Sequence, residues 1–297
     1  MGTPISTATT APSYAPTTDV DAPLDDKLAA LRVNLRRMAR VVVAYSGGVD
    51  SSLLAKVAHD VLGDEAVAVT ALSASLAESE RAEAARVAAE IGIRHEMLVT
   101  HELENADYRR NDRMRCFHCK AELFDCLQRY ADAHGIPYMV YGPVVDDLGD
   151  FRPGMAASRQ RGARAPMVEA GLRKADVREL ARRFDLPTWD KPAQACLASR
   201  VAYGTEVTVE RLSQVERAEA LLRAEGLHEL RVRHHDAIAR IEVPAEALPR
   251  LVDDSERRRR IVDGIKALGF AFVTLDLEGF RSGSMNEALP LADEDAP

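Results

Sequence analysis

The stretch VVVAYSGGVDSSLL, from Val41 to Leu54, places the strongest constraint on the fold of this chain. Four apolar residues lead into Tyr45, a Ser-Gly-Gly turn follows, and apolar residues at helical spacing begin directly after it. This pattern predicts a buried strand, a tight loop and the N-terminus of a helix. Such a helix start leaves backbone N–H groups without partners and places the positive end of the helix dipole behind them. The stretch therefore predicts a phosphate site.

The residues of this loop suit a phosphate together with a cation. Gly47 and Gly48 let a phosphate approach the backbone closely because neither has a Cβ. Ser46 and Ser51 add hydroxyl donors. Asp50 would repel a phosphate unless a cation lay between them, so we interpret it as a Mg2+ ligand. An ordinary Gly-Gly turn with Asp50 or Ser51 as helix cap is the alternative, but the complete string is more specific than a glycine pair.

The string Ser-Gly-Gly-Val-Asp-Ser differs from two common nucleotide-binding motifs. It lacks the Gly-Lys-Ser/Thr of the Walker loop and the glycine spacing of a Rossmann turn. It resembles instead the PP-loop of ATP pyrophosphatases, which cleave ATP to AMP and pyrophosphate while they activate a second substrate as an adenylate. ATP is the nucleotide that this resemblance implies.

Length and charge limit the classes of protein to consider. The 297 residues suffice for one large domain or two moderate ones. A formal net charge of −8 argues against nucleic-acid binding by the molecule as a whole, although it is compatible with a local basic patch. No apolar run approaches the roughly 18 residues of a membrane span. Residues 1–24 read as a disordered tail without signal-peptide features, so we expect a cytoplasmic protein that does not bind membranes.

Strand and helix patterns alternate along residues 25–204. Helices are predicted at 24–38, 78–91, 115–134 and 171–184, and further strands at 66–72, 94–99 and 136–141. This alternation predicts an α/β fold with a doubly wound parallel sheet, of the PP-loop or HUP-like type. The charged stretch 146–164 is expected to be a functional or disordered loop. Ser73 and Ser75 follow a strand, where open sheets bind ligands, so they either contact the adenosine of ATP or form an ordinary polar loop.

Four cysteines are present: Cys116, Cys119, Cys126 and Cys196. Clustered thiols in a cytoplasmic chain more often bind metals or act in catalysis than form disulfides. Cys116 and Cys119 lie one helical turn apart among basic residues, which favour thiolates. Two thiolates can chelate a metal centre, although such a site needs further ligands. Cys126 shares their helix face and is expected to be a core residue.

The stretch from Leu186 to Gly204 has the features of a shaped active-site loop. It contains two prolines and the only tryptophan of the chain, and it follows neither helical nor strand periodicity. Cys196 lies in it near Lys191 and Arg200. An ordinary surface loop would not need an apolar-flanked cysteine beside a Ser-Arg pair.

A smaller domain with a different composition is expected at residues 205–287, before a disordered acidic tail at 288–297. Helices are predicted at 209–225 and 251–268, and strands at 229–235, 237–243 and 271–277. These elements predict an α+β domain with an antiparallel sheet. Arg231 and Arg233 lie two apart on one strand, hence on one face, and could hold a phosphate between them.

Motifs in both halves of the chain carry a resemblance to one family. They are the phosphate loop, Arg115–Lys120, Asp150–Gly154, Lys191–Gly204, Arg231–His234, Ala239–Glu242 and Leu275–Asn286. With them the sequence resembles the LarE family of ATP-dependent sulfur transferases, which make the nickel-pincer nucleotide cofactor of lactate racemase. The resemblance covers nearly all of residues 25–287.

This resemblance implies a substrate and a set of residues that bind it. The substrate would be pyridinium-3,5-biscarboxylic acid mononucleotide, a small molecule whose carboxylates become thiocarboxylates after adenylation. Arg231 and Arg233, together with Arg281, Ser199 and Arg200, would contact its phosphate. A sulfide donor and a homo-oligomer are further expectations.

The resemblance also implies a role for three of the cysteines. In some family members the cysteine matching Cys196 surrenders its own sulfur and becomes dehydroalanine. Other members have two more cysteines, matching Cys116 and Cys119, and bind a 4Fe-4S cluster whose open iron carries an extra sulfide. Because this chain has all three cysteines, we expect the cluster type.

Three further interpretations follow from the same residues. Glu219 and Glu242 match family residues that bind a metal at a subunit contact, but the third acidic partner expected near Arg250 is absent. A tRNA thiolase would combine the same loop with a three-cysteine cluster, but it should carry a strongly basic surface or an RNA-binding module. A non-catalytic carrier or sensor would not need an intact Asp50 and a complete phosphate loop.

Overall fold

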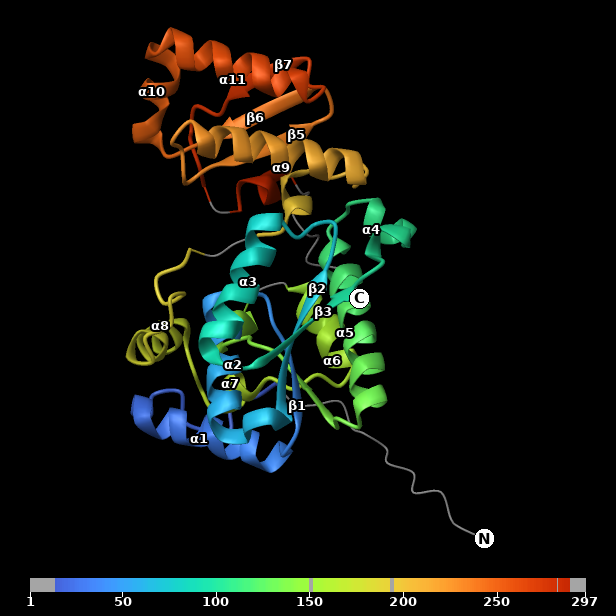
Figure 1. Ribbon diagram of the computed structural model, residues 1–297, viewed down its shortest axis with the longest axis vertical. Coiled ribbons are helices and arrows are strands. Elements are labelled where there is room, and N and C mark those ends of the chain that lie inside the picture. Colours follow the sequence, from blue (N-terminus) through green and yellow to red (C-terminus); the bar gives the residue numbers. More distant parts are fainter. Residues whose placement is uncertain (1–13, 150–151, 193–194, 282, 289–297) are drawn as a thin grey trace. The chain divides into compact units, whose positions relative to one another are not determined.

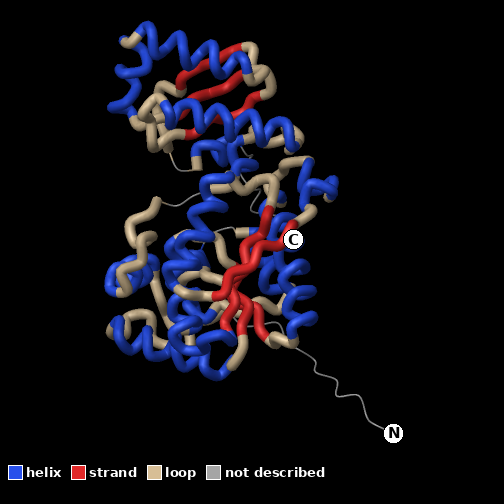
Figure 2. Tube along the Cα trace, viewed as in Figure 1, coloured by secondary structure: helices blue, strands red, loops and turns tan. Residues whose placement is uncertain are grey.

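The structure is a computed structural model (Figure 1), and it describes residues 14–149, 152–192, 195–281 and 283–288. Its strands form two separate sheets among helices (Figure 2). None of the helices in these described ranges combines the length and the apolar character that crossing a membrane requires.

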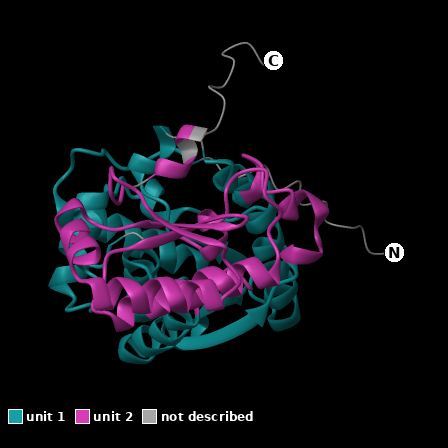
Figure 3. Cartoon of the chain, turned by 90° about the horizontal axis from the view of Figure 1, so that it is seen from above, with its two compact units in different colours: residues 1–73, 78–101, 116–194 teal, residues 74–77, 102–115, 195–297 magenta. Residues whose placement is uncertain are grey.

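The chain divides into two compact units that interleave along the sequence (Figure 3). Unit 1 comprises Met1–Ser73, Glu78–His101 and Cys116–Gln194, and unit 2 comprises Ala74–Ala77, Glu102–Arg115 and Ala195–Pro297. Two internal segments therefore belong with the C-terminal part of the chain. The division expected from composition is instead linear, with one boundary after residue 204.

Unit 1 is built on a four-stranded sheet in the order β3-β2-β1-β4, with all neighbours parallel. The strands are β1 Val41–Ala44, β2 Ala66–Leu72, β3 Arg94–Val99 and β4 Tyr138–Val140. The Val- and Ala-rich strands β1 and β2 are almost completely buried, as expected when helices cover both faces of a parallel sheet. The predicted parallel α/β sheet is confirmed.

Alternate residues of β1 face two different cores, because successive side chains of a strand point to opposite faces. Val41 and Val43 face a core shared with α1 Leu24–Met38, α2 Val49–Leu62, α3 Glu78–Ile91 and α8 Lys174–Arg183. Val42 faces a smaller core with Phe124 and Leu127 of α5 Arg115–His134. Unit 1 also contains the short helices α6 Pro153–Gln160 and α7 Pro166–Glu169, whereas α4 Ala106–Arg109 belongs to unit 2.

The charged stretch that was predicted to be a loop contains helix α6, Pro153–Gln160, so that prediction was wrong. The helix begins with a proline, whose missing N–H costs nothing in a first turn. Its Ala157 is fully buried. The flanking charges are paired, since Arg161 binds Asp125 of α5 at 2.7 Å. The local sequence shows only a high density of charges, which is typical of a loop. It does not show the ion-pair partners, because these are distant in the sequence.

Part of the N-terminal segment that was predicted to be disordered is packed onto unit 1. The hydroxyl of the buried Tyr14 donates a hydrogen bond to the carbonyl of Ala163 at 2.8 Å. The backbone N–H of Thr17 donates to the carbonyl of Glu169 at 2.9 Å. The rest of the two predicted tails, residues 1–13 and 289–297, lies outside the described residues.

Unit 2 contains a three-stranded sheet in the order β5-β6-β7. β5 Arg231–His235 and β6 Ile238–Glu242 are antiparallel, as predicted, and they meet at a turn where Asp236 has a φ of 51°. β7 Phe272–Leu275 pairs parallel to β6, so the prediction of a wholly antiparallel sheet was wrong. Parallel neighbours need a crossover, and here it contains α10 Leu248–Asp253 and α11 Ser255–Ala267.

The helices of unit 2 differ from the prediction at one place. α9 Val209–Ala224 lies within one residue of its predicted bounds. The single helix predicted at 251–268 is instead the pair α10 and α11. Asp254 separates them, because its side chain accepts a hydrogen bond from the N–H of Arg257 and caps α11.

Replacement of Phe124 should test how strongly the smaller core stabilises unit 1. Phe124 is fully buried and contacts the ring of Tyr141, with centroids 5.5 Å apart. Phe124→Ala should lower the free energy of unfolding by about 3–5 kcal/mol, because it removes buried surface and leaves a cavity. Urea denaturation followed by circular dichroism measures this change. Phe272→Ala, at a side chain 61% exposed, is the control, and equal losses for both variants would contradict the prediction.

Candidate active site

The predicted phosphate loop connects β1 to α2 and is ordered by its own polar groups. Ser51 Oγ accepts a hydrogen bond from the N–H of Ser46 at 3.2 Å and donates one to the carbonyl of Gly48 at 3.1 Å. Gly48 is the N-cap of α2 and offers no side chain to cap it. The first N–H groups of α2 thus lack intrahelical acceptors, which suits an anion at this helix start.

Gly47 is the position in the loop where the backbone accepts no other residue. Its φ is +69°, in the region that side chains of L-residues rarely adopt. A Cβ there would lie 2.8 Å from Cα of Ala84, a fully buried residue of α3. The loop is therefore packed directly against the middle of α3.

Lys174 contacts the proposed magnesium ligand, a contact that sequence reasoning missed. Its Nζ lies 2.6 Å and 2.5 Å from the two carboxylate oxygens of Asp50. Lys174 is the first residue of α8, and its own N–H donates to the carboxylate of Asp146 at 2.9 Å. The role of Asp50 as a Mg2+ ligand stays a prediction, and in the structure its carboxylate is paired with an ammonium group. Within the described ranges, no three His, Cys, Asp or Glu side chains form a group that could hold a metal ion.

A second ammonium group borders the phosphate loop within unit 1. Lys191, from the predicted active-site loop, places Nζ 2.8 Å from a carboxylate oxygen of Glu80 and 3.5 Å from the carbonyl of Gly47. Lys191 and Lys174 are 144 and 124 residues from their partners in the loop, so no local pattern could reveal them. Each of these ammonium groups is paired with a carboxylate, so the start of α2 and not an excess of charge is what favours phosphate here.

The two serines predicted to contact adenosine belong to different units. Ser73 directly follows β2 in unit 1, and its contact with adenosine stays a prediction. Ser75 is buried in unit 2, where its hydroxyl lies 2.5 Å from that of Tyr108. The carbonyl of Ser75 accepts a hydrogen bond from the N–H of Leu197 at 2.8 Å. Ser75 therefore holds the segment that follows Cys196.

The four thiols are free and differ in exposure. Cys116 is exposed and Cys119 is half-buried, and both lie at the beginning of α5 in unit 1. Cys196 is exposed and is the N-cap of a short 3-10 helix, Leu197–Arg200, in unit 2. Cys126 is buried, which confirms the prediction that it is a core residue.

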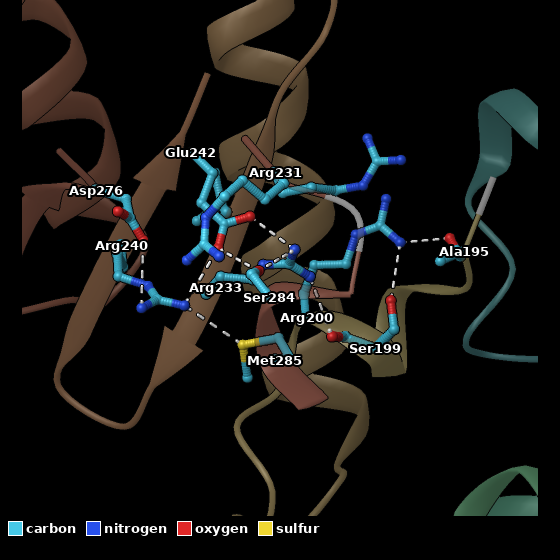
Figure 4. Close-up of polar contacts among 12 residues, drawn as sticks. Ala195, Ser199, Arg200, Arg231, Arg233, Arg240, Glu242, Asp276, Ser284 and Met285 are labelled. Atoms are coloured by element: carbon cyan, nitrogen blue, oxygen red, sulfur yellow. Dashed lines mark hydrogen bonds and ion pairs between the residues drawn. The ribbon is translucent and has the colours of Figure 1, made fainter. Parts of the chain in front are cut away.

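Unit 2 concentrates guanidinium groups beside the segment that carries Cys196 (Figure 4). What we call the arginine cluster comprises Arg200, Arg223, Arg231, Arg233 and Arg240 with the carboxylates of Glu219, Glu242 and Asp276. Five guanidinium groups stand against three carboxylates, which leaves two positive charges in excess. Three of the arginines, Arg200, Arg231 and Arg233, are buried beside two buried carboxylates, whereas Arg223 and Arg240 are partly exposed. Uncompensated buried charge is costly in a low dielectric, so this part of the cluster suits an anion.

Arg231 and Arg233 lie on the same face of β5, as predicted, and both are buried. Burial, assisted by the nearby Arg200, lowers the pKa of Arg231 to about 10. Its guanidinium lies over the ring of Phe280, 5.1 Å from the centroid. Arg233 binds Glu242 at 2.7 Å, while its Nε is buried without a hydrogen-bond partner. An anion would stabilise both charges.

The other three residues predicted to bind the substrate phosphate have protein partners. Arg200 is buried, and it donates to the carboxylate of Glu219 at 3.0 Å and to the carbonyl of Cys196 at 2.9 Å. The hydroxyl of Ser199 also donates to the carbonyl of Cys196, at 2.7 Å. Arg281 is bound to two carboxylates, those of Glu278 and Glu287. Their contact with a phosphate stays a prediction.

The carboxylates of Glu219 and Glu242 are occupied by arginines. Both residues are buried, at 1% and 0% exposure. Glu219 accepts hydrogen bonds from Arg200, Arg223 and the N–H of Val232, and Glu242 accepts them from Arg233, Arg240 and Ser284. A metal ion at either carboxylate would have to replace these arginines, and its binding stays a prediction.

Known proteins match this chain over most of its length. Residues 26–116, which include the phosphate loop, match the asparagine synthase family, a PP-loop domain. The chain is 38% identical over 272 residues to the pyridinium-3,5-bisthiocarboxylic acid mononucleotide synthase of Lactiplantibacillus plantarum, covering 91% of this chain and 98% of that protein. It is 47% identical over 266 residues to an uncharacterized protein of Synechocystis (90% and 99%). It is 26% identical over 259 residues to one of Methanocaldococcus jannaschii (86% and 98%).

Alkylation should distinguish the core thiol from the exposed ones. Burial, together with the carboxylate of Glu122, raises the pKa of Cys126 from 9.0 to about 11. At pH 8 this leaves about a hundredfold less thiolate, the reactive form, than an unperturbed thiol would have. Iodoacetamide should therefore modify Cys126 far more slowly than Cys116 and Cys196, as measured by peptide mass spectrometry on metal-free protein. The difference should vanish in urea, and equal rates in the folded protein would refute it.

Proposed function

The chain belongs to the LarE family of ATP-dependent sulfur transferases, and we propose that it converts the carboxylates of pyridinium-3,5-biscarboxylic acid mononucleotide to thiocarboxylates with the help of a 4Fe-4S cluster. The observation that carries this proposal is the 38% identity to the named synthase over 91% of the chain. The complete phosphate loop in unit 1 and the arginine cluster in unit 2 support it with sites for the two phosphorylated reactants.

Adenylation makes the carboxylate displaceable by sulfur. A carboxylate oxygen attacks the α-phosphorus of ATP and pyrophosphate leaves, after which a sulfur nucleophile attacks the acyl carbon and AMP leaves. We propose that the loop from Ser46 to Ser51 binds the pyrophosphate part of ATP through the N–H groups at the start of α2. In the structure the carboxylate of Asp50 is paired with the ammonium of Lys174, and a Mg2+ ion at Asp50 would replace this ion pair. Mg2+ held by Asp50 would neutralise phosphate charge during the transfer.

The arginine cluster is the proposed site for the phosphate of the substrate. A phosphate monoester carries close to two negative charges at neutral pH, because its second pKa is about 6. Three buried arginines of the cluster stand against two buried carboxylates, which leaves positive charge for such a ligand. Arg231 and Arg233 are the proposed phosphate ligands, because burial withholds water from both. Arg200 joins the cluster to the carbonyl of Cys196.

Cys116, Cys119 and Cys196 are the proposed ligands of the cluster. The first two are one helical turn apart and accessible, and Cys196 is exposed, so all three can bind iron. Arg115, the residue before Cys116, donates a hydrogen bond to the carbonyl of Ala198, two residues after Cys196. The proposal that the three thiols share one cluster rests on the family resemblance. The bound cluster would supply a sulfide on the iron that has no protein ligand.

Three properties of the enzyme follow from this proposal. Free thiols and a cluster require a reducing compartment, which we propose is the cytoplasm. More than one turnover requires an external sulfide donor. The family resemblance also leads us to propose a homo-oligomer, which light scattering can test.

An anaerobic reaction tests the proposed function. Enzyme, ATP, Mg2+, sulfide and the biscarboxylate nucleotide should form AMP, pyrophosphate and more than one thiocarboxylate per enzyme. Asp50→Ala should lower AMP formation at least about 100-fold, because it removes a group that stabilises phosphoryl charge. Asp60→Ala, at an exposed residue of the same helix paired with Lys56, should leave it unchanged. No AMP with the unaltered enzyme would exclude this substrate, and a normal yield from Asp50→Ala would exclude its magnesium role.

Iron content tests the three proposed cluster ligands. Cys116→Ala, Cys119→Ala and Cys196→Ala should each strongly lower the iron-to-protein ratio and the visible absorbance of anaerobically purified protein. Cys126→Ala should retain both, because its buried thiol binds no iron. Unchanged iron in the first three variants would rule out the ligand set. A single turnover that leaves dehydroalanine at Cys196 would show instead that this residue surrenders its own sulfur.

A further inference from the structure

Asn111 is a fully buried polar residue that has no part in the proposed chemistry. It lies just after α4 and has a φ of 56°. Its amide nitrogen donates hydrogen bonds to three carbonyls, those of Val201 at 3.2 Å, Ala202 at 2.8 Å and Thr205 at 2.9 Å. One amide group, with its two hydrogens shared among three acceptors, thus holds the segment that follows Cys196.

Arg115 completes this arrangement from the other side of the amide. Its Nη1 donates to Oδ1 of Asn111 at 2.6 Å and to the carbonyl of Ala198 at 2.7 Å. Arg115 is buried, and its guanidinium lies over the ring of Tyr203 at 5.7 Å. The N–H of Gly204 closes the set by donating to the carbonyl of Asn111 at 3.1 Å. The arginine can only donate, so it also determines which way the amide of Asn111 points.

These contacts act on a segment that has little regular structure of its own. Beyond the four-residue 3-10 helix, residues 195–205 are neither helix nor a strand of either sheet. The segment makes a few backbone hydrogen bonds of its own, such as that from the N–H of Thr205 to the carbonyl of Ala202 at 3.0 Å, and side-chain donors add to them. Near the start of this stretch, Arg200 donates to the carbonyl of Cys196 at 2.9 Å. The backbone is therefore held on both sides of Leu197, close to the thiol of Cys196.

We propose that Asn111 and Arg115 are positioning residues for sulfur transfer. They hold the segment 196–205 in the conformation in which Cys196 serves the transfer step, and they take no part in adenylation. Both belong to unit 2 with this segment, whereas the phosphate loop belongs to unit 1. The inference rests on the proposed function, and it distinguishes the two half-reactions: adenylation uses the loop, and sulfur transfer also needs this support.

The ratio of thiocarboxylate to AMP tests the proposal in the anaerobic reaction. Asn111→Asp keeps the size of the side chain and the acceptor for Arg115 but loses the donors to three carbonyls. It should form AMP within about twofold of the unaltered enzyme, while thiocarboxylate per AMP falls at least about tenfold, because a displaced reacting group loses its orientation. Water would then hydrolyse the adenylate to AMP and the original carboxylate. An unchanged ratio, or an equal loss of both products, would overturn the proposal.

Hydrogen exchange provides a test that needs neither substrate nor cluster. In Asn111→Asp, amides in residues 196–205 should exchange at least about tenfold faster, while those of β2 do not change. Asn105→Ala is the matched control in unit 2, because Asn105 only caps α4.

Should Asn111→Asp fail to fold, Arg115→Met should show the same two effects and Arg115→Lys should restore the product ratio. Normal exchange in both Asn111→Asp and Arg115→Met would refute the inference, and absence of AMP with the unaltered enzyme would refute only the proposed function.

Discussion

The close approach of Gly47 to Ala84 is the constraint on which the nucleotide site depends. With a separation that excludes a Cβ, the turn after β1 is packed directly onto α3. Its backbone N–H groups are therefore arranged before any ligand arrives, so little conformational entropy is lost when a phosphate binds. The buried valines of β1 and the hydroxyl of Ser51 maintain this geometry from either side. The same packing that stabilises the core of unit 1 therefore also preorganises the phosphate loop for binding.

Both units treat charge in the same way, although their folds differ. Around the phosphate loop, Lys174 and Lys191 are paired with Asp50 and Glu80. In unit 2, arginines neutralise buried carboxylates and remain in excess. A phosphorylated ligand would meet cations that are already positioned, and the accompanying carboxylates keep these cations from repelling one another while the site is empty. Cations that are held in position by carboxylates suit an enzyme with two anionic reactants.

The sequence predicted the elements whose pattern is local, and it failed where distant partners decide. The buried run at Val41 and the helix after Gly48 could be predicted because burial and periodicity are written in neighbouring residues. The direction of β7 could not, since a crossover of two helices determines it. The contact of Lys174 with Asp50 spans 124 residues, and that of Asn111 with Thr205 spans 94. The residue type indicates which kinds of group these side chains can bind. Which residue is the actual partner depends on the fold.

The donors that hold the Cys196 segment act on main-chain oxygen atoms. Hydrogen bonds to carbonyls fix the conformation of the backbone and do not depend on which side chains the segment carries. In a hydrophobic core, by contrast, the volume of each side chain matters. Ala195 is exposed and Ala202 is only half-buried, so both can change without removing a single one of these donors. Substitutions at these two positions should therefore alter the surface of the segment while its backbone conformation stays the same.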